Sequence, residues 1–98
     1  EPELAIDYYR KAIELDSAWV TPYYQLASAC RILFENYPDE NYVKERRFAV
    51  EKGHQIRPGP WSYRALLSYD RDVGEMKSAR KWYRKTMEDE NWRNANQE

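Results

Sequence analysis

The sequence predicts an all-α protein with about five helices. Apolar residues recur three and four residues apart through most of the 98-residue chain, which is the spacing of one face of an α-helix. Breaks that contain proline or glycine separate these stretches, and no stretch alternates apolar and polar residues as a half-buried strand would. Hydrophobic residues make up 42% of the chain and charged residues 34%, which is typical of a folded globular domain.

The first two predicted helices lie on either side of a short break at Asp16 and Ser17. The first covers residues 3–15 and carries an apolar stripe that includes Ala5, Tyr9 and Ala12. The second begins near Pro22, because proline is tolerated in the first turn of a helix, and continues to about residue 36. The two helices are therefore expected to form a pair joined by a tight connection.

Three further helices are predicted after the loop "ENYPDEN" (residues 35–41), where Pro38 ends the second helix. The third covers residues 42–56, and the breaker "RPGP" (residues 57–60) separates it from the fourth, over residues 61–72. Gly74 provides a turn before the fifth, over residues 75–90. A polar tail is expected over residues 91–98.

Two short patterns occur twice along the chain. Ala5-x3-Tyr9-x2-Ala12 recurs as Ala79-x3-Tyr83-x2-Thr86, and Tyr23-x2-Leu26-Ala27 recurs as Tyr63-x2-Leu66-Leu67. This pattern resembles the tetratricopeptide repeat, a unit of two helices and about 34 residues. The spacings exceed multiples of that length by about six residues, and the surplus is expected in the loop at residues 35–41.

The resemblance implies an antiparallel array of helix hairpins, an α-solenoid, over residues 1–90. It divides the chain into the second helix of a partial unit (3–16), a unit with a long internal loop (20–57) and a final unit (60–90). The middle unit departs most from the pattern, since Arg46 stands where a small residue is usual and Cys30 where an aromatic is usual. Because the chain begins at Glu1, with a lone second helix, it is expected to be part of a longer array.

The resemblance also implies a peptide-binding groove lined by the first helix of each unit. Such arrays are protein-interaction scaffolds without enzymatic activity of their own. An acidic or C-terminal peptide is the expected partner, because three arginines in the groove can pair with carboxylates and two aromatic rings can anchor apolar side chains. The predicted groove residues are Thr21, Tyr24, Gln25, Ser28 and Arg31 from the second helix, and Trp61, Arg64, Ser68 and Arg71 from the fourth.

The sequence predicts no catalytic, cofactor or metal site. Cys30 lies on an apolar helix face, so it is interpreted as a packing residue, not as a nucleophile activated by His54. One cysteine and one histidine do not supply the usual zinc ligands. Carboxylates such as Glu14 and Glu45 are spaced among lysines and arginines and are expected on solvated faces. The chain contains no glycine-rich phosphate loop.

Two alternative functions remain open. The first alternative to a free scaffold is an accessory domain of a larger enzyme such as a transferase. The second and lesser alternative is an RNA-processing scaffold, because the segments "KERRF" (44–48) and "RKWYRK" (80–85) mix basic and aromatic residues. The net charge of −1 disfavours nucleic acid. No apolar run approaches the roughly 20 residues that cross a bilayer. Exposed apolar ends would favour self-association, and the compartment stays undetermined, with the cytoplasm favoured.

Overall fold

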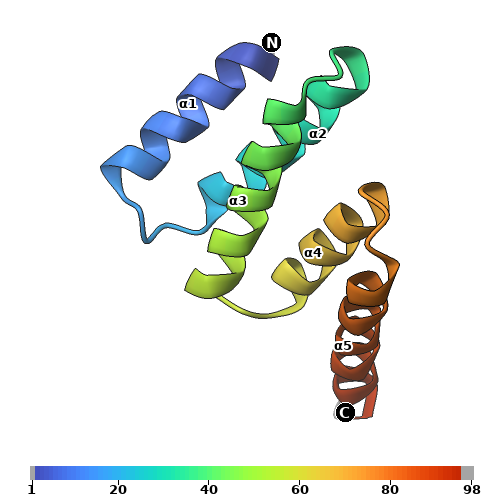
Figure 1. Cartoon of the computed structure of the whole chain (residues 1–98). Helices are drawn as coiled ribbons and strands as arrows, with labels where there is room; N and C mark the ends of the chain where they lie inside the picture. Colours follow the sequence, from blue (N-terminus) through green and yellow to red (C-terminus); the bar gives the residue numbers. More distant parts are fainter. Residues whose placement is uncertain (1, 96–98) are drawn as a thin grey trace. The chain divides into compact units, whose positions relative to one another are not determined.

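The chain is all-α in the computed structural model, which describes residues 2–95 (Figure 1). Over these residues it contains five helices and no strand: α1 (Pro2–Leu15), α2 (Thr21–Asn36), α3 (Glu40–Ile56), α4 (Pro60–Asp72) and α5 (Met76–Ala95). The predicted fold class and the order of the five helices are confirmed.

Two helix boundaries differ by more than one residue from those expected. Helix α3 begins at Glu40, two residues early, because the Asp39 carboxylate caps it by accepting a hydrogen bond from the Asn41 backbone N–H at 2.9 Å. Helix α5 continues to Ala95, so most of the predicted polar tail is helical. An ion pair between Arg93 and Asp89, one turn apart at 3.0 Å, supports this extension. Residues 96–98 of that tail lie outside the described part of the chain.

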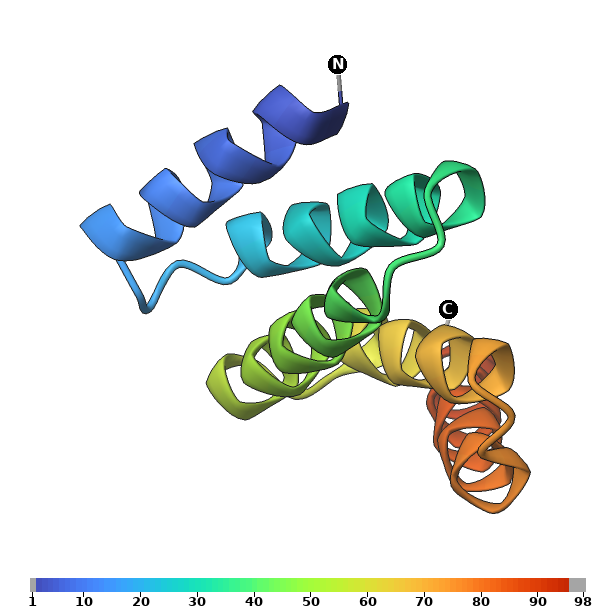
Figure 2. The same cartoon turned by 45° about the horizontal axis from the view of Figure 1, so that its top comes forward.

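The chain divides into two compact units at the break between Arg57 and Pro58. In the first unit, α2 packs against both α1 and α3. Figure 2 shows α2 between its two neighbours, with each helix running opposite to the one before it. In the second unit, α4 packs against α5. Each unit is therefore built from antiparallel helix pairs joined by short connections.

The core of the first unit is formed by the buried residues of α2 and by residues of the two helices beside it. Leu26, Cys30 and Leu33 are buried there, together with Ala49 and Val50 from α3. Small residues at the contact allow the two helix backbones to approach closely, and larger side chains fill the space beside them. The core also includes the Tyr23 ring and the Ile6 side chain of α1.

The second unit has a smaller core with more polar groups. Leu66 and Tyr69 of α4 are buried together with Ala79 and Thr86 of α5. At the start of α4 the buried Ser62 hydroxyl accepts a hydrogen bond from the Gly59 N–H and donates one to the Gly59 carbonyl, both at 3.0 Å. These bonds cap the helix with a side chain that is fully enclosed.

Gly74 makes the turn between α4 and α5. Its φ angle of +81° lies in the left-handed region that glycine adopts readily. The turn lets the Glu75 backbone N–H donate to the Asp70 carbonyl at 2.7 Å, which satisfies an otherwise free carbonyl at the helix end. The predicted tight turn is thus present at the predicted residue.

Candidate protein-interaction surfaces

Helix α2 turns four of its five predicted groove residues toward solvent. Thr21, Gln25, Ser28 and Arg31 are all exposed. Their spacing of four, three and three residues places them on one side of the helix, opposite the buried Leu26 and its neighbours. We call this set the α2 face.

Tyr24, the fifth predicted residue of α2, has a different position. It is half-buried, and its ring lies directly against Gly53 of α3. A Cβ atom on Gly53 would come within 2.9 Å of the Tyr24 Cε1 atom. Tyr24 is therefore primarily a contact between α2 and α3, and only part of its side chain meets solvent.

Ile32 is an apolar residue of this face that the sequence analysis did not identify. It is exposed and lies one turn after Ser28. Ile32 is followed directly by two more apolar residues, so the spacing in the sequence does not distinguish Ile32 from the buried Leu33. Only the packing of α2 against α1 and α3 decides which of these residues meets solvent.

Helix α4 carries the second predicted set. Trp61, Arg64 and Arg71 are exposed and Ser68 is half-buried, with spacings of three, four and three residues along one side of the helix. We call these four residues the α4 face. Trp61 is 76% exposed, more than Trp19 at 51%. A tryptophan with so little packing is available to cover an apolar group of a partner.

The three arginines of the two faces differ in their ion pairing. The Arg64 Nη2 atom lies 3.1 Å from the Glu90 Oε1 atom, so Arg64 links α4 to α5. Within residues 2–95, neither Arg31 nor Arg71 forms an ion pair, which leaves both guanidinium groups open to a carboxylate from outside.

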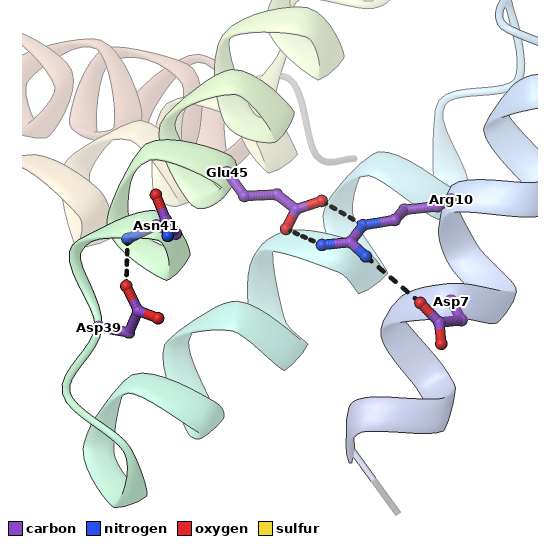
Figure 3. Close-up of polar contacts among 5 residues, drawn as sticks. All are labelled: Asp7, Arg10, Asp39, Asn41 and Glu45. Atoms are coloured by element: carbon purple, nitrogen blue, oxygen red, sulfur yellow. Dashed lines mark hydrogen bonds and ion pairs between the residues drawn. The ribbon is translucent and has the colours of Figure 1, made fainter.

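A network of charges connects α1 to α3. The Arg10 guanidinium donates two hydrogen bonds to the Glu45 carboxylate, from Nε at 2.7 Å and from Nη2 at 2.5 Å, and it reaches Asp7 at 3.3 Å (Figure 3). The bond to Glu45 raises the pKa of Arg10, against the smaller opposing effect of its burial. The expectation that Glu45 lies on a solvated face is therefore wrong, because its side chain is only 21% exposed and bridges two helices.

Cys30 lies close enough to this network for its charges to affect the thiol. Burial, and to a smaller extent the Glu45 carboxylate, raise the pKa of Cys30 to about 12, against the opposing effects of Arg10 and Arg46. The thiol is therefore neutral near pH 7 and acts as a small packing group. His54 lies half-buried in the second half of α3.

Within the described residues, the structure groups no three histidine, cysteine or acidic side chains in an arrangement that would hold a metal ion. Over the same range, none of the helices combines the length and apolarity needed to cross a bilayer. Comparisons with protein-family models, with curated proteins and with solved structures find no match to this chain. The geometry of the exposed faces therefore carries the functional argument.

Proposed function

We propose that this chain is a non-enzymatic protein-interaction scaffold of the tetratricopeptide type, and that it binds a short peptide with an acidic side chain or a free C-terminal carboxylate. The observation that carries the proposal is the α4 face, where an exposed tryptophan and two arginines share one side of a helix. Aromatic and arginine side chains are enriched among the residues that dominate protein interfaces.

The dimensions of the α4 face suit a short extended peptide. Trp61 and Arg71 are ten residues apart in one helix, which corresponds to about 15 Å along its axis. An extended peptide spans that distance with about five residues. We propose that an apolar side chain of the peptide covers the Trp61 ring and that its carboxylate pairs with Arg71.

The α2 face offers a similar combination of groups. Arg31 is open to a carboxylate, Ile32 offers an apolar contact, and Gln25 and Ser28 can exchange hydrogen bonds with a peptide backbone. Both faces thus support the same class of ligand, and each can be tested by itself.

The test is an array of short peptides with free C-termini, followed by titration of the best binder. Trp61→Ala should weaken binding roughly tenfold or more, the size of effect expected for an interface anchor. Arg71→Ala should weaken it by several-fold, and the triple variant Arg31→Ala/Arg64→Ala/Arg71→Ala should abolish measurable binding. Amidation of the peptide C-terminus separates recognition of the terminal carboxylate from recognition of an acidic side chain.

Matched controls are available on other exposed surfaces. Trp19→Ala removes a tryptophan outside both faces, and Arg47→Ala removes an exposed arginine of α3. Neither should change peptide affinity. The proposal fails if no peptide binds, or if the best peptide binds equally well to the folded Trp61→Ala and triple arginine variants.

A further inference from the structure

Helix α5 exposes a stripe of residues beside the side that packs against α4. Met76, Arg80, Tyr83 and Met87 follow one another at spacings of four, three and four residues, so they lie along one side of the helix. Met76, Tyr83 and Met87 are 51%, 56% and 37% exposed. We call these four residues the α5 seam.

The side of α5 that packs against α4 lies next to the seam, because Ala79 and Thr86 each follow a seam residue by three positions. Ala79 and Thr86 are buried, and the Trp82 ring stacks on Tyr63 of α4 at a centroid distance of 6.0 Å and an angle of 20°. These contacts attach that side of α5 to α4. The seam is therefore an exposed apolar surface on a helix that already packs against α4 through its neighbouring side.

Positive charge follows one edge of the seam. Between Met76 and Met87 the helix contains five basic residues and no acidic one. On the edge next to the seam lie Lys77 and Arg84, which we call the basic flank. Lys81 lies 4.6 Å from the centre of the Trp82 ring, and Lys85 lies 5.8 Å from the centre of the Tyr63 ring.

Several cations on other helices form ion pairs. Lys11, Lys44, Arg47 and Arg64 each pair with a carboxylate of the protein. Over residues 2–95, no basic residue between Met76 and Met87 forms such a pair. The concentration of unpaired positive charge beside an apolar seam indicates a partner that is both anionic and apolar.

The spacing of the seam indicates the shape of that partner. The apolar residues Met76, Tyr83 and Met87 are seven and four residues apart, so they form a ridge along one side of the helix that a second helix can pack against, and methionine adapts readily to different partner side chains. A phosphate backbone would pair with the basic flank but would leave the two methionines uncovered. A bilayer requires a broader apolar face, and here Arg80 interrupts the middle of the seam.

We propose that the α5 seam and its basic flank form a docking site for an amphipathic helix of a partner protein, with apolar residues on its inner stripe and acidic residues along its edge. The apolar stripe covers Met76, Tyr83 and Met87. The acidic edge pairs with Lys77 and Arg84, and Arg80 forms an ion pair with a carboxylate beside the stripe. This site lies on a different helix from the proposed peptide-binding faces and is independent of them.

The test uses two synthetic helical peptides and the complete chain. One peptide has leucines on its inner stripe and glutamates beside them, and the other has lysines in place of the glutamates. Fluorescence anisotropy should detect binding of the glutamate peptide alone, and its affinity should fall as salt is raised from about 0.05 to 0.5 M. The variant Lys77→Glu/Arg80→Glu/Arg84→Glu should weaken binding roughly tenfold or more.

A matched control distinguishes binding at this site from nonspecific attraction between the peptide and the net charge of the protein. The variant Lys11→Glu/Lys44→Glu/Lys52→Glu changes net charge by the same amount on exposed positions of α1 and α3, and it should retain most of the affinity. A second variant, Met76→Ser/Tyr83→Ser/Met87→Ser, keeps every charge and should also lose binding, with circular dichroism confirming that both site variants remain helical.

Three outcomes would overturn the proposal. The first is equal loss of affinity in the site and control charge variants, which would indicate unspecific attraction. The second is binding of single-stranded RNA or anionic vesicles through the same residues while the glutamate peptide fails to bind. The third is concentration-dependent self-association that the serine variant abolishes without any peptide binding, which would make a second copy of this chain the occupant.

Discussion

Arg10 of α1 and Glu45 of α3 are 35 residues apart in the sequence and face each other through two parallel hydrogen bonds. Both helices pack against α2, so the pair joins two elements that α2 holds on its two sides (Figure 3). Paired donors of this kind fix the orientation of the two groups as well as their distance. The relationship leads to a quantitative test of how the first unit is held together.

A double-mutant cycle on Arg10→Ala and Glu45→Ala should give a coupling energy of about 1 kcal/mol, because the pair is bidentate but partly exposed. Urea unfolding followed by circular dichroism measures the four free energies of unfolding. The same cycle on Lys11 and Glu14, an exposed pair at 3.8 Å, should give less than about 0.3 kcal/mol. Equal coupling in both cycles would show that the Arg10–Glu45 geometry contributes nothing beyond an ordinary surface pair.

Cys30 should make the stability of the protein fall at alkaline pH. The thiol pKa is about 12 in the folded chain, against an ordinary value of 9.0. Above pH 9 the unfolded chain therefore loses this proton while the folded chain keeps it, so rising pH favours unfolding. The loss should reach about 1 kcal/mol by pH 10.

The measurement for Cys30 compares wild type with Cys30→Val by urea unfolding at pH 8 and pH 10. Because both proteins contain the same nine tyrosines, titration of those groups cancels in the difference. The difference in unfolding free energy between the two proteins should shift by about 1 kcal/mol in favour of the variant. A difference that is independent of pH would mean that the thiol titrates similarly in the folded and unfolded chains.

Gly53→Ala should destabilise the first unit although alanine is the better helix former. The new Cβ would lie 2.9 Å from Cε1 and 3.0 Å from Cζ of Tyr24, so the ring has to move. We expect a net loss of about 1 kcal/mol after the gain in helix propensity. Pairing the substitution with Tyr24→Ala should remove the clash and restore the propensity gain. Gly59→Ala, where a Cβ meets nothing within 4 Å, is the control and should change stability little.

Asp70→Leu should raise the stability of the second unit. Asp70 is only 8% exposed, and within the described part of the chain its Oδ2 atom has no hydrogen-bond partner. A buried oxygen without a partner costs free energy, so an apolar side chain should raise the free energy of unfolding by about 1 kcal/mol. Thermal and urea unfolding measure the change, with the exposed Glu88→Leu as a control that should stay within about 0.5 kcal/mol of wild type. A loss of stability in Asp70→Leu would contradict this assignment.

Local patterns predicted the helices and the turn residues well. Pro22, Pro38 and Gly74 act within a few residues of their own position, by restricting φ, by removing a donor or by allowing a left-handed turn. The extension of α5 to Ala95 was missed because the segment is polar and has little apolar periodicity. An ion pair one turn apart, between Asp89 and Arg93, was the signal available in the sequence.

The predicted surface residues show the limit of such patterns. Spacing alone placed Gln25, Ser28 and Trp61 on exposed sides of their helices, because a polar stripe opposite an apolar one faces solvent. Spacing did not reveal that Tyr24 lies against Gly53, or that Arg64 already holds Glu90. Each of those contacts joins two helices, and the periodicity of one helix does not indicate which residues of another helix it will contact.

By itself, the sequence determined the all-α class, the order of the helices and the positions of the breaks, since these depend on interactions within a few residues. The tertiary structure alone decided that Glu45 bridges to Arg10, that Gly53 accommodates the Tyr24 ring and that Met76, Tyr83 and Met87 remain uncovered. These features depend on which faces of different helices meet. That choice is made by the packing of the helices against one another, which brings together residues far apart in the chain.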